Sequence, residues 1–290
     1  MKLYPECGPC MLRRVLLFCV NEDDETKRRV IREVCNLFSK RLTGECTTVE
    51  LAYERNRIVE SITGDKDPMR ELKKISFDAA LKMYPKLKQY VDGVIGEKKR
   101  LKTALRIALS GNSLEFGAQD HEPNIDKLED EIFNAISTAP HIDDSSRVIE
   151  RIMKAKKILY VTDNAAEVVF DKILIEELDK YAQVSIAPLS RPVQDDASME
   201  EIRKAGIIKG HKIIPRGDSI GVWFDKVTKD FQKIWDESEL VFAKGMGCYE
   251  TLSEYPEKTA GKVALLMKVK CVPVSRDVKA PLGSTVIKLI

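Results

Sequence analysis

The chain has 290 residues, of which 43% are hydrophobic and 32% charged, and its formal net charge is only +2. This length allows one large domain or two smaller ones, and the interspersed charges indicate neither a nucleic-acid nor a membrane partner. No apolar run is long enough to span a bilayer or to form the core of a signal peptide, so we expect a cytoplasmic protein. The odd number of cysteines, seven, predicts mostly reduced thiols.

The first motif along the chain is Cys7-Gly8-Pro9-Cys10, the pattern of a thioredoxin-type redox centre. Such centres follow a strand in a βαβ unit, whereas only six residues precede Cys7. A helix is predicted to follow, and its N-terminus would lower the pKa of the Cys7 thiol. Three interpretations stay open, of which we favour the first: a buried cysteine pair at a helix start, a metal site completed by a distant ligand such as Cys35 or Cys46, or a redox centre.

The next part of the chain, residues 9–110, carries apolar side chains at the spacing of amphipathic helices. Residues 64–68, with the sequence GDKDP, interrupt this pattern with turn-forming residues. Residues 98–110 predict a further amphipathic helix, and the polar residues 118–126 predict a loop. We therefore predict a mainly helical N-terminal domain over residues 1–125.

After about residue 150, short buried strands alternate with helices. The predicted strands are 157–162, 184–189, 212–214, 240–243, 263–269 and 286–289, and the predicted helices are 167–181, 198–205 and 224–236. This alternation is typical of a mostly parallel sheet with helices on both faces. We therefore predict an α/β fold in which the helical domain packs on an α/β domain over residues 126–290.

Polar residues and glycines follow four of these strands. They occupy residues 162–167, 191–198, 215–219 and 244–250. Ligands of open α/β sheets bind beyond the carboxyl ends of the strands, so these stretches are expected to surround one site. Carboxylate and amide oxygens in the first two stretches suit Mg²⁺, Mn²⁺ or a similar divalent ion. The alternative, in which Asp163-Asn164 is only a helix-capping turn, is disfavoured by the other three strand ends.

The last of the four stretches combines a lysine with two glycines. Gly245 and Gly247 would let backbone N–H groups approach a phosphate, and Lys244 adds positive charge. A divalent metal, a lysine and backbone amides together predict phosphoryl-transfer chemistry. Two rival templates do not match, because a Walker A loop is absent and Ala165 stands where haloacid-dehalogenase phosphatases have a second Asp. The absence of a GxGxxG motif after the first strand also disfavours a dinucleotide-dependent dehydrogenase.

Taken in this order, the motifs resemble the DUF89 family of metal-dependent phosphatases, also called damage-control or ARMT1-like phosphatases. The resemblance is strongest to its stand-alone prokaryotic and archaeal branch. It covers almost the whole chain and is carried by the CxxC motif, residues 64–68 with Lys73, and residues 111–117, 163–167, 192–198 and 244–250. It implies a helical domain joined to a Rossmann-like α/β domain that binds metal and phosphate.

The resemblance also implies the residues of the site. One divalent ion, Mn²⁺, Co²⁺, Ni²⁺ or Mg²⁺, would be held by Asp163, Asn164 and Asp196. Asp163 and Lys244 would be catalytic, with Lys244 contacting the substrate phosphate. The predicted substrate-binding residues are Asn112, Glu115, Glu167, Gly245 and Gly247. The chain departs from the family pattern at Glu115, Asp195 and Cys248, none of which is a predicted metal ligand.

We therefore predict a metal-dependent phosphatase of small phosphorylated metabolites, such as sugar phosphates, in metabolite damage control. Attack by a water oriented by Asp163 or Asp196 and formation of an aspartyl-phosphate at Asp163 both fit the residues. A pocket between the two domains would select the substrate. Two alternative functions are a non-catalytic phosphometabolite or nucleotide binder and a thiol redox protein working through Cys7 and Cys10. The sequence does not reveal the substrate, the metal or the oligomeric state.

Overall fold

A seven-stranded sheet forms the centre of the α/β part of the chain, as seen in a computed structural model that describes residues 1–113 and 128–290. Its order is β1-β7-β6-β5-β2-β3-β4, and only the β6–β7 pair is antiparallel. The strands are β1 (Ile142–Asp143), β2 (Lys157–Val161), β3 (Gln183–Ala187), β4 (Lys212–Ile213), β5 (Leu240–Lys244), β6 (Val263–Lys268) and β7 (Thr285–Leu289). Counted from β2, the order β4-β3-β2-β5-β6-β7 is that of Rossmann folds, so the predicted α/β class is confirmed.

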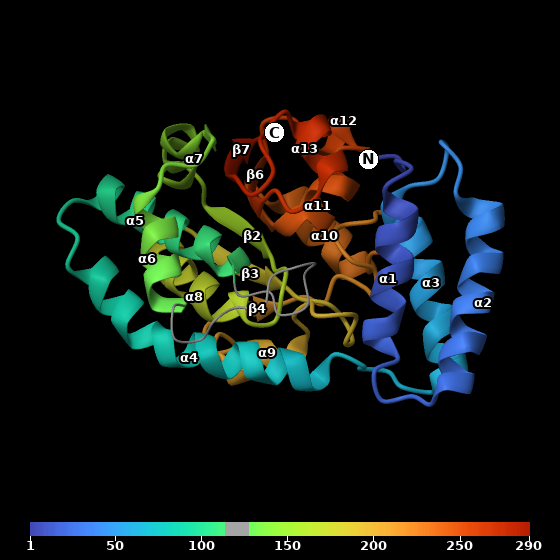
Figure 1. The fold of residues 1–290 in the computed structure, drawn as a ribbon. Coiled ribbons are helices and arrows are strands. Elements are labelled where there is room, and N and C mark those ends of the chain that lie inside the picture. The colour runs from blue at the N-terminus through green and yellow to red at the C-terminus, as the bar shows by residue number, and fades with distance from the viewer. Residues whose placement is uncertain (114–127) are drawn as a thin grey trace.

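Helices cover both faces of this sheet (Figure 1). One layer contains α4 (Arg70–Asp92), α5 (Glu97–Ser110), α6 (Leu128–Ser137), α7 (Ser145–Ile152), α8 (Glu167–Leu178) and α9 (Met199–Lys204). The other contains α10 (Lys229–Glu237), α11 (Gly245–Leu252) and α13 (Val272–Val278), with the short α12 (Pro256–Thr259) after α11. Within β2, Ile158 and Tyr160 face the first layer, whereas Leu159 and Val161 face the second. Because both faces of the central strands β2, β5 and β6 are buried, these strands are nearly continuous apolar runs that the sequence reveals directly.

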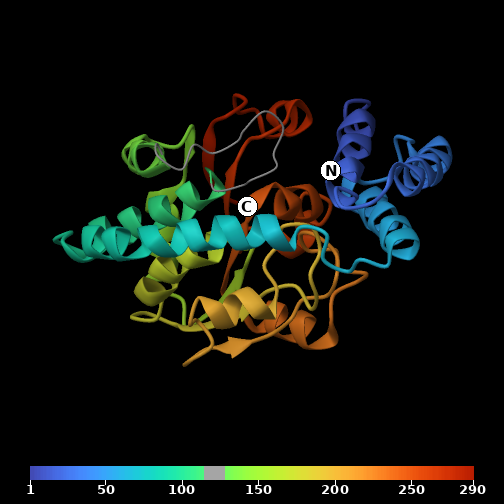
Figure 2. The ribbon, with the colours of Figure 1, turned by 60° about the horizontal axis from the view of Figure 1, so that its bottom comes forward.

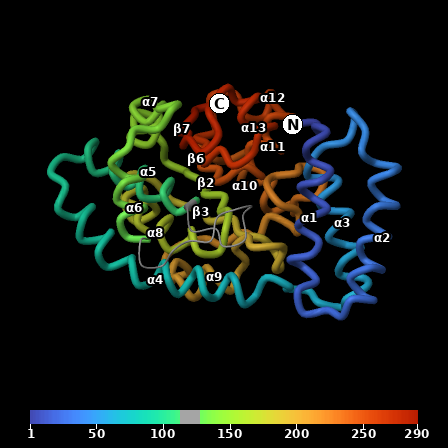
Figure 3. The backbone as a smooth tube through the Cα atoms, in the orientation of Figure 1, coloured from blue at the N-terminus to red at the C-terminus, as the bar shows by residue number. Residues whose placement is uncertain are grey.

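The first three helices have a hydrophobic core of their own. They are α1 (Cys7–Phe18), α2 (Asp24–Arg41) and α3 (Thr48–Thr63), and Val15, Val34 and Leu51 are buried between them. Figures 2 and 3 show these helices grouped at one side of the α/β part. Side chains of α4 and α5, by contrast, belong to the core of the sheet. The division of the chain at residue 125 stays a prediction.

Local signals explain where several helices begin and end. Thr47 and Glu50 form a capping box that starts α3, and Gly64, with a φ of 72°, ends it at the predicted break. The helix predicted over residues 224–236 was wrong at its start, since Thr228 caps α10 by accepting the Phe231 N–H at 3.2 Å. The sequence did not predict β1, which is too short to have a pattern. None of the described helices is long and apolar enough to cross a bilayer.

Candidate active site

The site lies where the strand order reverses, between β2 and β5. The connection from β2 leads to β3 on one side, and β5 pairs with β2 on the other. Ligands of open α/β sheets bind in the crevice at such a switch point. Asp163 and Asn164 follow the end of β2, and Gly245 follows Lys244, the last residue of β5. The strand-end residues predicted to surround a site are therefore brought to the expected position.

Asp163 packs directly on the backbone of Gly245. A Cβ atom at position 245 would lie 1.7 Å from Oδ2 of Asp163, which is far inside van der Waals contact. Gly245 also has a φ of 77°, in the left-handed region that favours glycine. A glycine is therefore needed here both for the turn into α11 and to leave room for the carboxylate. This packing places Asp163 beside the first turn of α11, whose N–H groups lack intrahelical acceptors.

The loop after β3 is joined to the loop after β2 by backbone pairing. Asn164 and Asp196 form an isolated antiparallel bridge, and the Ala197 N–H donates to the carbonyl oxygen of Asp163 at 2.7 Å. Asn164 and Asp196 are both buried, with 9% and 6% of their surface exposed. The three predicted metal ligands, Asp163, Asn164 and Asp196, therefore lie on two segments that are hydrogen-bonded to each other.

Glu167, at the start of α8, orients the amide of Asn164. Its Oε1 accepts hydrogen bonds from Nδ2 of Asn164, at 2.7 Å, and from Nδ2 of Asn112 in the 3₁₀ turn η1 (Gly111–Ser113). Because the amide nitrogen of Asn164 faces Glu167, its Oδ1 is left as the ligand atom. Asn112 is held in turn by the Lys268 N–H, which donates to its Oδ1 at 2.9 Å. Asn112 and Glu167 thus lie behind a predicted metal ligand, and their predicted contact with substrate stays a prediction.

The carboxyl groups of the site are destabilised as anions. Burial, followed by repulsion from Glu167 and Asp196, raises the pKa of Asp163 well above its ordinary value. Burial also raises the pKa of Asp196 to about 7, even though Arg216 donates to its Oδ2 at 3.3 Å. A bound cation would relieve this repulsion and favour the ionised carboxylates.

The donor set fits a hard divalent cation. Asp163, Asn164 and Asp196 offer two carboxylates and one amide oxygen, the ligand types that Mg²⁺ and Mn²⁺ accept. Within residues 1–113 and 128–290, no group of three His, Cys, Asp or Glu side chains is arranged to hold a metal. The amide of Asn164 would therefore be a necessary third protein ligand.

Lys244 is completely buried, and its ammonium group is occupied by protein acceptors. Nζ donates to the carbonyl oxygen of Ala108 at 2.8 Å, to Glu167 Oε2 at 2.8 Å and to Asp171 Oδ1 at 2.7 Å. These bonds use the three donors of a lysine, so a contact with substrate phosphate would require one of them to break. The catalytic role of Lys244 stays a prediction.

We expect the Lys244→Met substitution to lower the free energy of unfolding by about 3–5 kcal/mol, because it leaves buried charge on Glu167 and Asp171 without a cation. Chemical denaturation measures this change. The control is Lys102→Met, which removes a half-exposed partner of Asp143 and should cost less than about 1 kcal/mol. Equal stability of wild type and Lys244→Met would show that the network contributes nothing to folding.

Two residues of this neighbourhood had no predicted role of their own, although Arg216 lies in the strand-end stretch 215–219 that was expected at the site. Arg216 is 1% exposed and donates to Asp196, to the Ala187 carbonyl at 2.8 Å and to the Gly221 carbonyl at 3.0 Å. Asp171 lies one turn after Glu167 on an otherwise apolar face of α8. Two buried acids at this spacing were a signal that a cation had to lie opposite them.

The remaining predicted substrate-binding residues have different outcomes. Gly247 lies in the first turn of α11, close to Gly221, whose N atom would be 3.5 Å from an added Cβ. Glu115 lies outside the described residues. The predicted contacts of both with substrate stay predictions.

The cysteines of the CxxC motif lie in the first turn of α1 and are free thiols. Burial raises the pKa of Cys7, and this effect outweighs the lowering by a backbone hydrogen bond at Tyr4, so the predicted lowering of the pKa was wrong. Cys35 is exposed and Cys46 is buried. Neither completes a metal site with Cys7 and Cys10, since the described part of the chain contains no metal-binding group of three such side chains.

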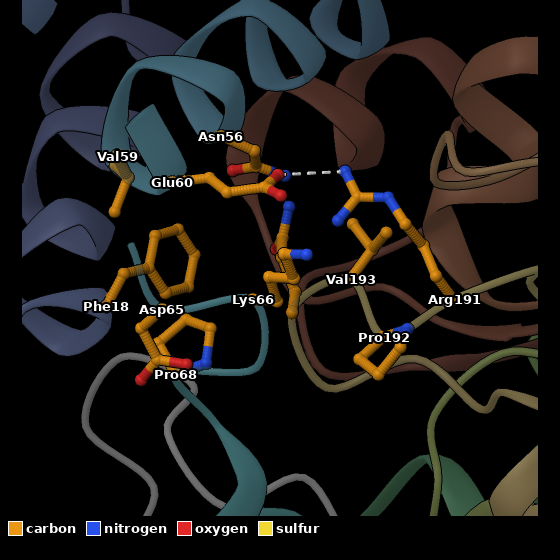
Figure 4. A pocket seen from close by; sticks show the side chains of 11 residues that line it. Phe18, Asn56, Val59, Glu60, Asp65, Lys66, Pro68, Arg191, Pro192 and Val193 are labelled. Atoms are coloured by element: carbon orange, nitrogen blue, oxygen red, sulfur yellow. Dashed lines mark ion pairs between the residues drawn. The ribbon is translucent and has the colours of Figure 1, made fainter. Parts of the chain in front are cut away.

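A pocket lies between α1, α3 and the loop after β3, which also carries the predicted metal ligand Asp196. Figure 4 shows Phe18 and Val59 from these helices on one side of it and Arg191 and Val193 from the loop on the other. Its lining residues are Phe18, Asn56, Val59, Glu60, Asp65, Lys66, Pro68, Arg191, Pro192, Val193 and Gln194. The pocket thus lies between the N-terminal helices and the α/β part, where selection of the substrate was predicted.

Comparison with known proteins covers nearly the whole chain. Residues 3–286 match the family model described as the damage-control phosphatase ARMT1-like domain. The chain belongs to this family. The crystal structure of a DUF89 family protein, PH1575 from Pyrococcus horikoshii, matches this ARMT1-like structure with a TM-score of 0.89 and 29% identity, over 100% of this chain and 99% of that chain.

Archaeal relatives support the same assignment. The damage-control phosphatase of Archaeoglobus fulgidus is 29% identical over 100% of both chains. The damage-control phosphatase PH1575 of P. horikoshii is 30% identical over 99% of this chain and 97% of its own. The uncharacterized protein MJ0202 of Methanocaldococcus jannaschii is 29% identical over 99% and 95%. The family predicted from the sequence motifs, in its stand-alone archaeal form, is confirmed.

Proposed function

We propose that this ARMT1-like protein is a metal-dependent phosphatase that hydrolyses small phosphorylated metabolites in metabolite damage control. Sugar phosphates or related phosphomonoesters are the proposed substrates. The main support is the group of Asp163, Asn164 and Asp196 at the switch point of the sheet, beside the first turn of α11. This arrangement combines hard ligands for a cation with backbone donors for a phosphate.

The residues of the chain have separable tasks in this proposal. Asp163, Asn164 and Asp196 hold one divalent ion, which supplies positive charge for phosphoryl transfer. The N–H groups at the start of α11, near Gly245, donate to the phosphate oxygens. Glu167 keeps Asn164 oriented, and Lys244 neutralises Glu167. Asp163 either orients the attacking water or accepts the phosphoryl group itself.

Phosphate release from p-nitrophenyl phosphate and a panel of sugar phosphates tests the proposal. Chelator-stripped protein should be inactive, and adding Mn²⁺, Co²⁺, Ni²⁺ or Mg²⁺ singly should restore release with at least one of them. Tight binding of sugar phosphates without release under any of these conditions would instead identify a phosphometabolite binder. The cytoplasmic location expected from the sequence stays a prediction.

Metal affinity should rise with pH, because protons and the metal compete for the same carboxylates. Burial raises the pKa of Asp196 to about 7. Below this pH the metal must displace a proton from Asp196, so its affinity falls by about tenfold for each unit by which the pH is lowered. Calorimetric titration with Mn²⁺ at pH 5.5, 6.5 and 7.5, in two buffers of different ionisation enthalpy, gives both Kd and the number of protons released. A Kd that is constant over this range would contradict the raised pKa.

A further inference from the structure

Two carboxamide side chains that line the pocket have orientations set by arginines. Nε and Nη2 of Arg55 both donate to Oδ1 of Asn56, at 3.1 and 2.8 Å. Nη1 of Arg14 donates to Oε1 of Gln194 at 3.1 Å. A guanidinium group has no acceptor, so each amide oxygen must face its arginine and each NH₂ group points elsewhere. Asn56 and Gln194 both line the pocket, and their NH₂ groups are the ends that these arginines leave unused.

These NH₂ groups lack acceptors within the described part of the chain. Nε2 of Gln194 is buried without a partner, and the residue is only 6% exposed. Nδ2 of Asn56 donates to no described protein atom. A buried donor without an acceptor costs about 1–3 kcal/mol, and Gln194 also adopts a φ of 52°, which is unfavourable for a residue other than glycine. Such strained, unsatisfied groups are concentrated at ligand-binding sites.

Arg55, behind the Asn56 donor, carries a positive charge that no carboxylate of the described residues balances. Arg55 is 1% exposed, and its guanidinium lies 5.0 Å from the ring centroid of Phe18. No ion pair joins it to a carboxylate anywhere in residues 1–113 and 128–290. Burial, followed by repulsion from Arg14, lowers the pKa of Arg55 to about 9, so it stays protonated at neutral pH. An anion in the pocket would provide the missing counter-charge.

The acids that line the pocket do not supply this counter-charge, because both already have cationic partners. Glu60 pairs with Arg57 at 3.2 Å and with Arg191 at 3.1 Å, the ion pair drawn in Figure 4. Asp65 lies 3.6 Å from Arg70. The charge available to a ligand in the pocket is therefore positive.

We propose that this pocket binds a second anionic group of the substrate, a carboxylate or a second phosphate, while the scissile phosphate occupies the metal site. The inference rests on the proposed phosphatase function. Gln194 lies two residues before the metal ligand Asp196, so one loop serves both sites, while Asn56 approaches from α3. The substrate class is accordingly a phosphorylated sugar acid or a bisphosphate, in preference to a monophosphate whose sugar carries no second anionic group.

Matched pairs of compounds test this preference on the metal-loaded full chain. They are 3-phosphoglycerate with glycerol 3-phosphate, 6-phosphogluconate with glucose 6-phosphate, and fructose 1,6-bisphosphate with fructose 6-phosphate. In at least one pair, we expect the member with the second anionic group to have a kcat/KM at least about tenfold higher. This is the effect of a hydrogen bond to a charged group. The pair that responds distinguishes carboxylate from phosphate. If nothing is hydrolysed, calorimetric Kd values of the same pairs replace kcat/KM.

The outcomes separate this inference from the proposed function. Hydrolysis of both members of every pair with equal kcat/KM overturns the anion pocket and leaves the phosphatase standing. Preferential binding of the member with the second anionic group, without hydrolysis, supports the anion pocket and overturns the proposed phosphatase function. Equal Kd values without hydrolysis overturn both.

The Asn56→Asp variant tests the donor directly. Aspartate keeps one oxygen for Arg55 and places a second, charged oxygen where the NH₂ group pointed. We expect the preference for the compound with the second anionic group to fall by at least about tenfold, while the melting temperature is unchanged or higher because Arg55 gains a counter-charge.

Gln194→Glu makes the same change at the other donor, beside Arg14. Asn36→Asp, at an exposed position on α2, is the charge-matched control and should keep the preference. A wild-type preference in both Asn56→Asp and Gln194→Glu would overturn the inference.

Discussion

The Asp163→Asn variant is expected to lose metal-dependent phosphate release by more than about a hundredfold. Replacing a residue that merely supports a metal ligand lowers metal affinity or activity about 10- to 100-fold, and Asp163 is itself a proposed ligand. The substitution keeps the shape of the side chain against Gly245 but removes the charge that attracts the cation. Release from p-nitrophenyl phosphate, measured at saturating Mn²⁺, Co²⁺, Ni²⁺ and Mg²⁺, gives the loss. Activity near that of wild type would remove Asp163 from the proposed site.

The same variant should fold at least as well as wild type when metal is absent. The pKa of Asp163 is higher in the folded chain than in the unfolded one. Ionised Asp163 therefore opposes folding, and wild-type stability falls as the pH rises above the unfolded pKa toward the folded one. Asparagine does not titrate, so the stability advantage of Asp163→Asn should grow from pH 5 to pH 8. Thermal unfolding in a chelator at both pH values measures this difference and separates lost activity from lost structure.

The Gly245→Ala variant should lose metal binding although it changes no ligand. Its Cβ would overlap Oδ2 of Asp163, which must then leave its present position in the proposed metal site. The left-handed φ adds backbone strain of about 1–2 kcal/mol. We expect Mn²⁺ affinity to fall by more than about tenfold, as for the loss of a supporting group. Calorimetric titration with Mn²⁺ measures the change.

Gly261→Ala is the matched control for Gly245→Ala. Gly261 has a φ of 70°, close to that of Gly245, but no atom lies within 4 Å of the Cβ that alanine would add. Both variants carry the same kind of backbone strain, so the difference between them isolates the clash with Asp163. Equal loss of stability with intact metal affinity in both would show that Asp163 has room to move without leaving the metal position.

The sequence predicted the parts of the fold that depend on local pattern. Strands such as β2 and β5 are buried on both faces and therefore appear as apolar runs. Because strand ends locate ligand sites, residues 162–167 and 191–198 were expected at one site, and the structure joins these two segments. The choice of Asp163, Asn164 and Asp196 within them came from the resemblance to the family. Tertiary packing decides which hydrophobic core a helix belongs to. The sequence therefore did not reveal that α4 and α5 share the core of the sheet.

The residues without a predicted role acquire one only through distant partners. Arg216 reaches Asp196 across two loops, and Lys244 meets Asp171 between β5 and α8. In a helical pattern Arg55 resembles a surface cation, yet it is buried behind Phe18. The identity of an acceptor or counter-charge is a property of three-dimensional packing, and no spacing along the chain encodes it.

The pocket has one wall from α1 and α3 and another from the loop that carries Asp196. In the proposed function, bond-breaking chemistry and choice of molecule are thus divided between segments that are far apart in the chain. Substitutions in α3 would then alter which compound is accepted while the proposed metal ligands stay untouched. Such a division allows relatives with one reaction centre to diversify in substrate by changing their N-terminal helices alone.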